Sequence, residues 1–494
     1  MTPPVEDGPL FPLTNLPSRC LLKKSPAGEN RMKTDAKEIR FFEQEPVPVA
    51  IAHLALPTIV GQIILVLYNM ADTFFIGLTG SDAKLAAVTV CLPAFMFLSA
   101  IANLFGVGGA GESARSLGSS DRKSAGEACA FSFWGCIALT VLYTALAILL
   151  RHPFTDILGG GDPEVHRYAT GYLLITVGLG GLGTSMNMLM AHLFRSEGRS
   201  LDASIGIISG SLLNIALDPV FMFVILPEGK EVLGAAIATA LSNWIALGIM
   251  LYLQYRRKHP SVLSFRFPLS PDRKMVRRIL GTGLPACIMT LFENISYACL
   301  DRLMMANGTA AQAGLGVAKK INMLAHATVR GLTQGVLPLI AYNHASKNLK
   351  RMKRVIRDTV VIALTIGGSC MLACLFAARP LVGIFVKPGE SLTLGMRFLR
   401  ILCIGAPFSA VAYTFISFFQ AVGRWQSAFV LAVLRKGFLD IPLMFLLCLV
   451  NPLYGIVVAT PAADCVCFLT AILLYRLYYM RNLREGEMVK EENN

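Results

Sequence analysis

Charge is scarce in this chain of 494 residues, because Lys, Arg, Asp and Glu together make up only 15%. A soluble domain carries about 25%. Hydrophobic residues make up 54%, and the mean hydropathy is +0.58. Cysteine pairs at zinc-binding spacing are also missing, and the 12 cysteines lie almost entirely in apolar stretches. These absences argue against a disulfide scaffold or a cysteine metal centre, and they indicate a membrane protein.

Further absences bear on function. The chain has no G-x-x-x-x-G-K-[ST] phosphate loop, so ATP is not the expected fuel within this polypeptide. The net charge of +14 comes from Lys and Arg in short links, not from a continuous patch, which argues against a nucleic-acid partner. Residues 1–40 are polar and lack the apolar core of a signal peptide. We expect a disordered cytoplasmic tail there, with Met32 as an alternative start.

The remaining chain is a series of apolar stretches, each long enough for the roughly 20 residues of a transmembrane helix. We expect twelve spans, at residues 47–78, 84–112, 126–150, 167–194, 201–226, 232–255, 276–306, 312–344, 354–378, 392–423, 427–450 and 453–481. The longest can tilt, or kink at Pro57, Pro93, Pro285 and Pro407. The sequence therefore predicts an all-α polytopic membrane protein.

Alternate links between these spans are basic. The links that contain Arg122, Arg199 and Lys350 and the link 256–275 carry Lys and Arg, whereas the link around Glu228 has mixed charge. By the positive-inside rule, the basic links and both termini face the cytoplasm of a bacterial cell (inner) membrane. An even number of spans agrees with that orientation.

The two halves of the chain repeat each other at four points in the same order. The matching pairs are Leu56-Pro57 with Leu284-Pro285, Arg195-x-x-Gly198-Arg199 with Gln420-x-x-Gly423-Arg424, Leu217-Asp218 with Leu439-Asp440, and Gly234-x-x-x-Ala238-Thr239 with Gly455-x-x-x-Ala459-Thr460. We expect six-helix lobes at residues 41–255 and 276–481, a cytoplasmic linker at 256–275 and a cytoplasmic tail at 482–494. Lobes of equal orientation are related by an axis along the membrane normal, with a central site between them.

Two carboxylates lie deep in apolar stretches of the first half. Asp218 stands in the stretch 205–226, and Asp72 stands in the stretch 47–78. A charge at that depth costs roughly 2.5–3.5 kcal/mol, so it normally faces a protein interior or a wet cavity. Asn214 precedes Asp218 by one helical turn and shares its helix face. The pattern predicts a transporter of a proton, an ion or a solute, not an enzyme.

Three motifs resemble the multidrug and toxic compound extrusion (MATE) family of prokaryotes. They are Leu67-Tyr-Asn-Met-Ala-Asp72-Thr-Phe-Phe-Ile-Gly77, Arg195-x-x-Gly198-Arg199 and Asn214-Ile-Ala-Leu-Asp218-Pro219. The resemblance covers about residues 40–480. It implies a V-shaped antiporter of two six-helix lobes. Such an antiporter exports amphipathic, often cationic compounds in exchange for H⁺ or Na⁺, by alternating access.

The resemblance also implies an ion site in the first lobe. Its residues here are Asp72, Asn214, Asp218 and Thr239. Their carboxylate, amide and hydroxyl oxygens can hold a proton or Na⁺, and we expect no other cofactor. The structural alternative is that both acids brace helices through hydrogen bonds without titrating.

In the second lobe, Asn214 and Asp218 correspond to Lys436 and Asp440. A Lys four residues before an Asp can neutralise it, so this pair predicts a structural ion pair and not a cation site. One branch of the MATE family uses a Glu on the seventh span, and Glu293 stands eight residues after Pro285 as in that branch. The Asp that this branch has on its tenth span has no counterpart within 408–420.

Candidate cleft residues of the second lobe are Glu293, Asp301, Lys319 and His326. Glu293 can attract a cationic drug or carry a second proton, while Asp301 can simply pair with Arg302 near the outer face. Lys319 and His326 share a helix face with Arg330, which predicts a basic stripe. That stripe can favour anionic groups of a substrate or pair with Glu293; snorkelling to an interface is the alternative for the lysines.

Small-molecule drugs or organic cations and the lipid bilayer are the expected partners of a monomer. A lipid-linked oligosaccharide flippase of the same superfamily is the alternative, which Lys319, Lys320 and Lys436 keep open. A polytopic membrane enzyme or receptor is a third reading. It requires a catalytic or metal cluster or a ligand-binding extramembrane domain, and the duplicated halves favour alternating access instead.

Overall fold

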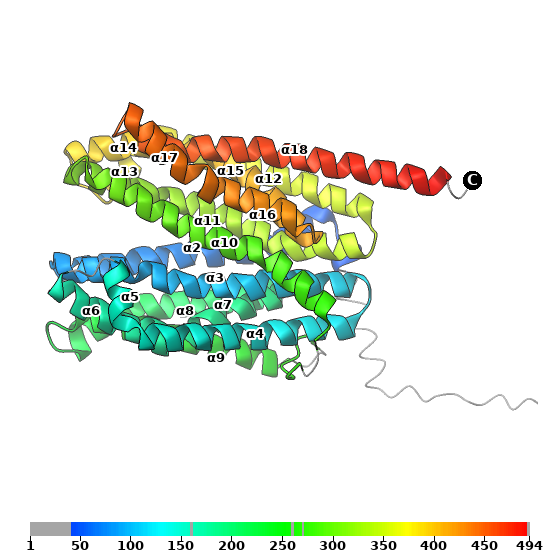
Figure 1. Ribbon diagram of the computed structural model, residues 1–494, viewed down its shortest axis with the longest axis horizontal. Helices are drawn as coiled ribbons and strands as arrows, with labels where there is room; N and C mark the ends of the chain where they lie inside the picture. The colour runs from blue at the N-terminus through cyan, green and yellow to red at the C-terminus, as the bar shows by residue number, and fades with distance from the viewer. Residues whose placement is uncertain (1–40, 159–161, 258–260, 269–270, 492–494) are drawn as a thin grey trace, which may run out of the picture.

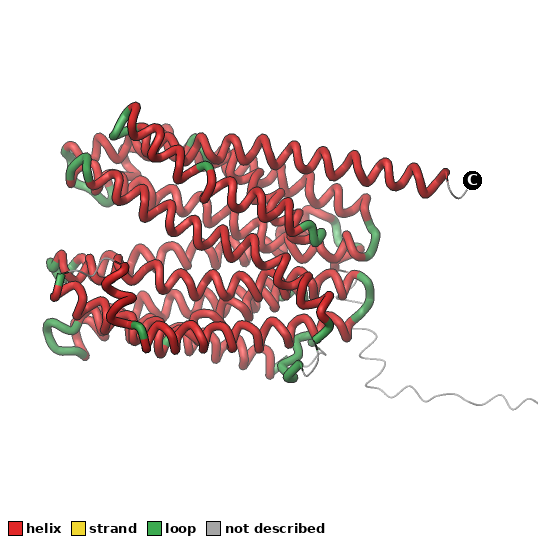
Figure 2. Tube along the Cα trace, in the orientation of Figure 1, coloured by secondary structure: helices red, strands yellow, loops and turns green. Residues whose placement is uncertain are grey.

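The computed structural model describes residues 41–158, 162–257, 261–268 and 271–491, so the tail predicted at 1–40 lies outside the described part. Helices make up nearly all of these residues, and no strand occurs among them (Figure 2). Two helical bundles lie side by side, formed by the first and second halves of the chain (Figure 1). The predicted all-α architecture of two repeated bundles is confirmed.

The first lobe runs from α2 to α9. Its helices are α2 (Val47–Gly77), α3 (Asp82–Gly118), α4 (Arg122–Leu149), α5 (Arg151–Leu158), α6 (Pro163–Leu173), the π-helix η1 (Leu174–Leu179), α7 (Gly181–Ser196), α8 (Ser200–Val220), the π-helix η2 (Phe221–Ile225) and α9 (Glu231–Tyr255).

The second lobe runs from α10 to α18. Its helices are α10 (Arg273–Met305), α11 (Thr309–Ala345), α12 (Leu349–Phe376), α13 (Ala378–Gly383), α14 (Glu390–Cys403), α15 (Ala406–Ala421), α16 (Trp425–Val433), the π-helix η3 (Leu434–Phe438), α17 (Asp440–Val450) and α18 (Gly455–Glu491). The last helix extends beyond the expected end of the final span at residue 481.

Within the described residues, eight helices are long and apolar enough to cross a membrane, or ten if each of two bent pairs counts as one span. One pair bends by 48° at Gly180, and the other bends by 42° between α14 and α15, just before Pro407. The two other expected spans, α11 and the α16–η3–α17 stretch, are also helical and carry several charged side chains.

Small residues set how closely the lobes approach. Helix α3 packs against α10, and α2 packs against α11 (Figure 1). A Cβ atom on Gly283 would overlap the Leu104 carbonyl, and one on Gly335 would lie 2.7 Å from the Leu54 carbonyl oxygen. Glycine at these positions therefore lets two pairs of helix backbones meet across the lobe interface.

The repeated turns adopt the same backbone geometry in both lobes. Gly198 ends the turn after α7 with φ +80°, and Gly423 ends the turn after α15 with φ +75°. Glycine adopts this left-handed conformation without the steric cost of a side chain. Both turns lie at the end of the molecule that also holds the α3–α4 and α11–α12 turns (Figure 1). We call it the basic end, because the Lys- and Arg-rich links gather there.

Candidate ion site and central cavity

A polar cluster lies inside the first lobe, where α8 packs against α2 and α9. Asp218 is fully buried (0% exposed), and Asn214 and Thr239 are buried beside it. In the amide orientation that satisfies its neighbours, Asn214 Nδ2 donates to Asp218 Oδ2 at 3.1 Å, and Thr239 Oγ1 donates to Asn214 Oδ1 at 3.2 Å. The structure therefore brings three of the four predicted ion-site residues into one hydrogen-bonded chain.

Asp72, the fourth residue, lies on α2 close enough to Asp218 for an electrostatic interaction. One oxygen of each carboxyl group, Oδ1, is buried and has no hydrogen-bond partner among the described residues. No Lys, Arg or His among the described residues lies within ion-pairing distance of either carboxyl group. A buried carboxyl oxygen without a donor or cation is costly. The donor set fits a proton or Na⁺.

The second lobe contains the same position in a neutralised form. Asp440 Oδ2 is 3.0 Å from Lys436 Nζ and accepts a hydrogen bond from Ser296 at 2.6 Å. Asp440 Oδ1 accepts from Thr460 at 3.0 Å, and Thr460 is the repeat counterpart of Thr239. The predicted Lys436–Asp440 ion pair is therefore present, and hydroxyl groups complete its hydrogen bonds.

A second buried ion pair was missed from the sequence. Arg435 Nε lies 2.7 Å from Asp464 Oδ1, and its guanidinium carbon lies 4.2 Å from the centre of the Tyr413 ring. The signal was present, since Asp464 is an acid inside the apolar stretch 453–481 and Arg435 adjoins Lys436. The second lobe thus holds its buried charges in matched pairs.

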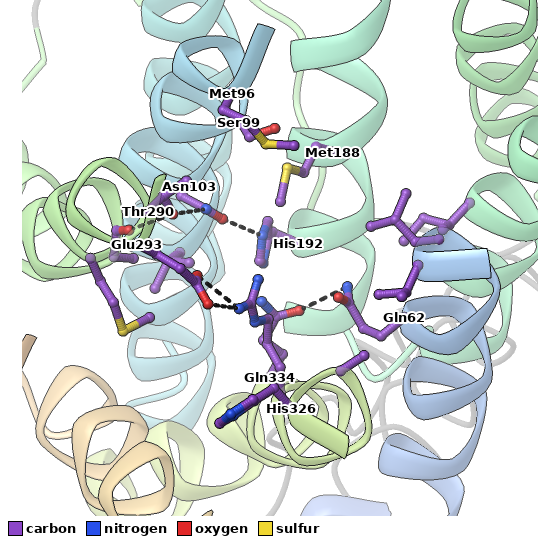
Figure 3. A pocket seen from close by; sticks show the side chains of 18 of the residues that line it. Gln62, Met96, Ser99, Asn103, Met188, His192, Thr290, Glu293, His326 and Gln334 are labelled. Atoms are coloured by element: carbon purple, nitrogen blue, oxygen red, sulfur yellow. Dashed lines mark hydrogen bonds and ion pairs between the residues drawn. The ribbon is translucent and has the colours of Figure 1, made fainter. Parts of the chain in front are cut away.

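A cavity of about 250 Å³ lies between the lobes, and its walls come from both (Figure 3). His192 Nε2 donates to Asn103 Oδ1 at 3.2 Å, and Asn103 Nδ2 donates across the lobe boundary to Thr290 Oγ1 at 2.9 Å. Asn214 reaches the cavity wall, whereas Asp72 and Asp218 are not part of it. The polar cluster therefore lies behind the cavity in the first lobe.

Two of the four predicted cleft residues of the second lobe line this cavity, namely Glu293 and His326. Both Glu293 carboxyl oxygens lie 2.8 Å from Arg330 Nη2, so the predicted pairing of Glu293 with the basic stripe is confirmed, and Arg330 is the partner. Arg330 also lines the cavity, so the prediction that the basic stripe lines the cleft is confirmed for His326 and Arg330.

Asp301 and Lys319 do not line the cavity. Lys319 Nζ lies 2.6 and 2.5 Å from the two oxygens of Asp301, so the expected pairing of Asp301 with Arg302 is wrong. The tight turn between α10 and α11 brings Asp301 and Lys319 opposite each other, whereas Arg302 points to another side of the helix and is exposed.

A charged cluster joins the lobes at the basic end, which we call the clamp (Glu112, Arg115 and Arg278). Glu112 is 2.8 Å from Arg115 within α3 and 2.6 Å from Arg278 of α10. Arg115 also donates to the carbonyls of Gln420 and Ala421 at 3.0 and 3.1 Å. These bonds tie α3 of the first lobe to two helices of the second.

Comparison with known proteins identifies the family. The family model MatE matches residues 57–220 and 285–446, which is more than half of the chain and covers both lobes. The chain belongs to the MATE family. MATE proteins are multi-pass membrane transporters, so the prediction of a transporter and not an enzyme is confirmed.

Similar MATE proteins include the multidrug export protein MepA of Staphylococcus haemolyticus (strain JCSC1435). It is 28% identical over 464 residues, covering 92% of this chain and 99% of the relative. The fold matches a MATE crystal structure in complex with MaL6, with a TM-score of 0.83 and 22% identity over 90% of this chain and 98% of that one. An outward-facing MATE transporter of the MOP superfamily matches over the same shares, with a TM-score of 0.82 and 22% identity.

Proposed function

We propose that this MATE protein is an antiporter that exports amphipathic small molecules in exchange for H⁺ or Na⁺. The observation that carries the proposal is the first-lobe cluster, where Asp218 is fully buried and keeps a carboxyl oxygen without a partner. A proton or Na⁺ at Asp218 and Asp72, with oxygens of Asn214 and Thr239 nearby, would supply what the protein does not. The coupling ion would be the transporter's only cofactor.

The repeat supports a division of labour between the lobes. In the second lobe Lys436 already neutralises the equivalent Asp440, so no mobile cation is needed there. The first lobe therefore couples ion binding to transport, because only its carboxylates can change charge state without leaving a buried cation unpaired. The two lobes rock about the central cavity and expose it alternately to each side.

The cargo is small and amphipathic. Relatives named as multidrug export proteins favour drugs over lipid-linked sugars as the transported compounds. The sequence favoured organic cations, but Glu293 is the one acid on the wall of the cavity within the described residues, and Arg330 already pairs with it. The protein acts as a monomer in a bacterial cell membrane, with its termini in the cytoplasm.

Efflux of ethidium, and of the acid-bearing dye rhodamine B, from cells tests the coupling site. Wild-type protein and the Asp218→Asn variant are compared with the proton and sodium gradients collapsed separately. We expect wild-type efflux to stop with one of the two gradients, and the variant to lose at least about 90% of its efflux rate, since an amide neither titrates nor holds Na⁺ as a carboxylate does.

The matched control is Asp202→Asn on the same helix, because Asp202 lies in the first turn of α8 and pairs with Arg199. The control variant is expected to keep its efflux. Full activity of Asp218→Asn at normal expression would contradict the proposed site, and efflux that ignores both gradients would contradict ion coupling.

A further inference from the structure

Arg195 is a buried cation without a carboxylate. It lies in the last turn of α7, is 2% exposed and lines the central cavity. Its one side-chain hydrogen bond among the described residues runs from Nη1 to His192 Nδ1 at 3.3 Å, and its Nε is buried without a hydrogen-bond partner there. Burying an unpaired charge is costly, so buried cations normally face a counterion.

The other cations that are buried, largely buried or on the cavity wall follow that rule. Arg115 pairs with Glu112, Arg330 with Glu293, Arg435 with Asp464 and Lys436 with Asp440. Arg195 thus differs from four cations in the same molecule. The wall of the cavity consequently carries the charges of Arg195 and Arg330 against the single charge of Glu293, an excess of one positive charge.

The turn that contains Arg195 does not itself require a guanidinium group. A cation near the carbonyl end of a helix is favourable by about 0.3–1 kcal/mol, which offers a purely structural reason for Arg195. However, Gln420 occupies the equivalent place before the equivalent glycine turn in the second lobe, where φ at Gly423 is +75°. A neutral residue therefore builds the same turn in this same chain.

We propose that Arg195 is the counter-charge for an anionic group, such as a carboxylate, of the exported compound. The transported molecule would be an amphipath that bears an acid, with its apolar body against the aromatic and methionine side chains of the cavity. His192, hydrogen-bonded to both Arg195 and Asn103, positions the guanidinium at the wall. This inference rests on the proposed export of small molecules and names their chemical class.

Binding of a matched dye pair tests the subsite. Rhodamine B has a free carboxylate, and its ethyl ester keeps the same cationic ring system without the acid. We expect the purified full-length protein in detergent to bind the acid at least about 10-fold more tightly than the ester, measured by fluorescence polarisation. Equal or tighter binding of the ester by the wild-type protein would overturn the proposal without any variant.

Three variants locate the effect. Arg195→Gln installs the residue of the second lobe and should bring the acid-to-ester ratio close to one, while Arg195→Lys should retain part of the preference. Arg424→Gln is the matched control, since Arg424 stacks on Tyr478 and does not line the cavity. A full preference in Arg195→Gln would overturn the assignment. The assay measures binding without an ion gradient, so its result tests the Arg195 subsite even if the protein is not an antiporter.

Discussion

At the scale of single residues, the two lobes differ at one position next to their equivalent buried aspartates. Asp218 and Asp440 occupy equivalent positions, but the residue one turn earlier is Asn214 in the first lobe and Lys436 in the second. Lys436 gives Asp440 a cation at 3.0 Å, whereas Asp218 keeps an unpartnered oxygen. The identity of that neighbour therefore decides which lobe keeps an unpartnered carboxylate oxygen, on which the proposed ion site rests.

The second-lobe pair should behave as a structural unit. Lys436→Met leaves Asp440 buried without its cation, and we expect a loss of about 3–5 kcal/mol in stability. The double variant Lys436→Met/Asp440→Leu should recover most of that loss. Thermal melting of the purified proteins measures both changes. A single variant as stable as wild type would contradict a buried ion pair at this position.

The sequence predicts side-chain pairs best where both partners lie on one helix or where the position recurs in the repeat. The Lys436–Asp440 pair was predictable, because both residues share a helix face four positions apart. Between helices, the pairing of Glu293 with the basic stripe was predicted and Arg330 makes it. The pair of Asp301 with Lys319 was not predicted, since it depends on the relative register of α10 and α11. In the sequence, Arg195 stood out only as part of a turn motif. That it has no carboxylate partner among the described residues is known only from the three-dimensional structure.

At the scale of helices, apolar length predicted the spans well and their ends poorly. The span expected to end at residue 112 continues as α3 to Gly118. Glu112 and Arg115 resemble a helix end in sequence, but both remain helical, and Glu112 pairs with Arg115 and with Arg278 of the other lobe. The span expected at 427–450 contains the π-helix η3, which holds Arg435 and Lys436; such segments are frequent at functional sites.

The contact between α3 and α10 should tolerate no added side chain. In Gly283→Ala the new Cβ would overlap the Leu104 carbonyl, so the helices must separate, and we expect about 1–3 kcal/mol of lost stability with impaired efflux. Gly368→Ala is the control, because nothing lies within 4 Å of a Cβ atom at that position in α12. Thermal melting and ethidium efflux are measured for both. Equal behaviour of the two variants would argue against a close lobe contact at Gly283.

At the scale of the whole molecule, the two lobes meet along α2 with α11 and α3 with α10, and the clamp ties them at the basic end. The proposed rocking of the lobes would have to break the bonds from Arg115 to the Gln420 and Ala421 carbonyls. The polar cluster of the proposed ion site lies inside the first lobe, behind a cavity that both lobes share. We propose that a change of charge at Asp218 reaches the cavity through Asn214, which is bonded to Asp218 and lines the cavity wall.

The most direct test of ion coupling uses purified protein in liposomes with a gradient of a transported drug and no imposed ion gradient. Drug movement in one direction should drive H⁺ or Na⁺ in the other, followed with an internal pH dye and with radioactive sodium. We predict counter-movement of one ion in wild type and none in Asp218→Asn. Drug transport by the wild-type protein without movement of either ion would contradict the account.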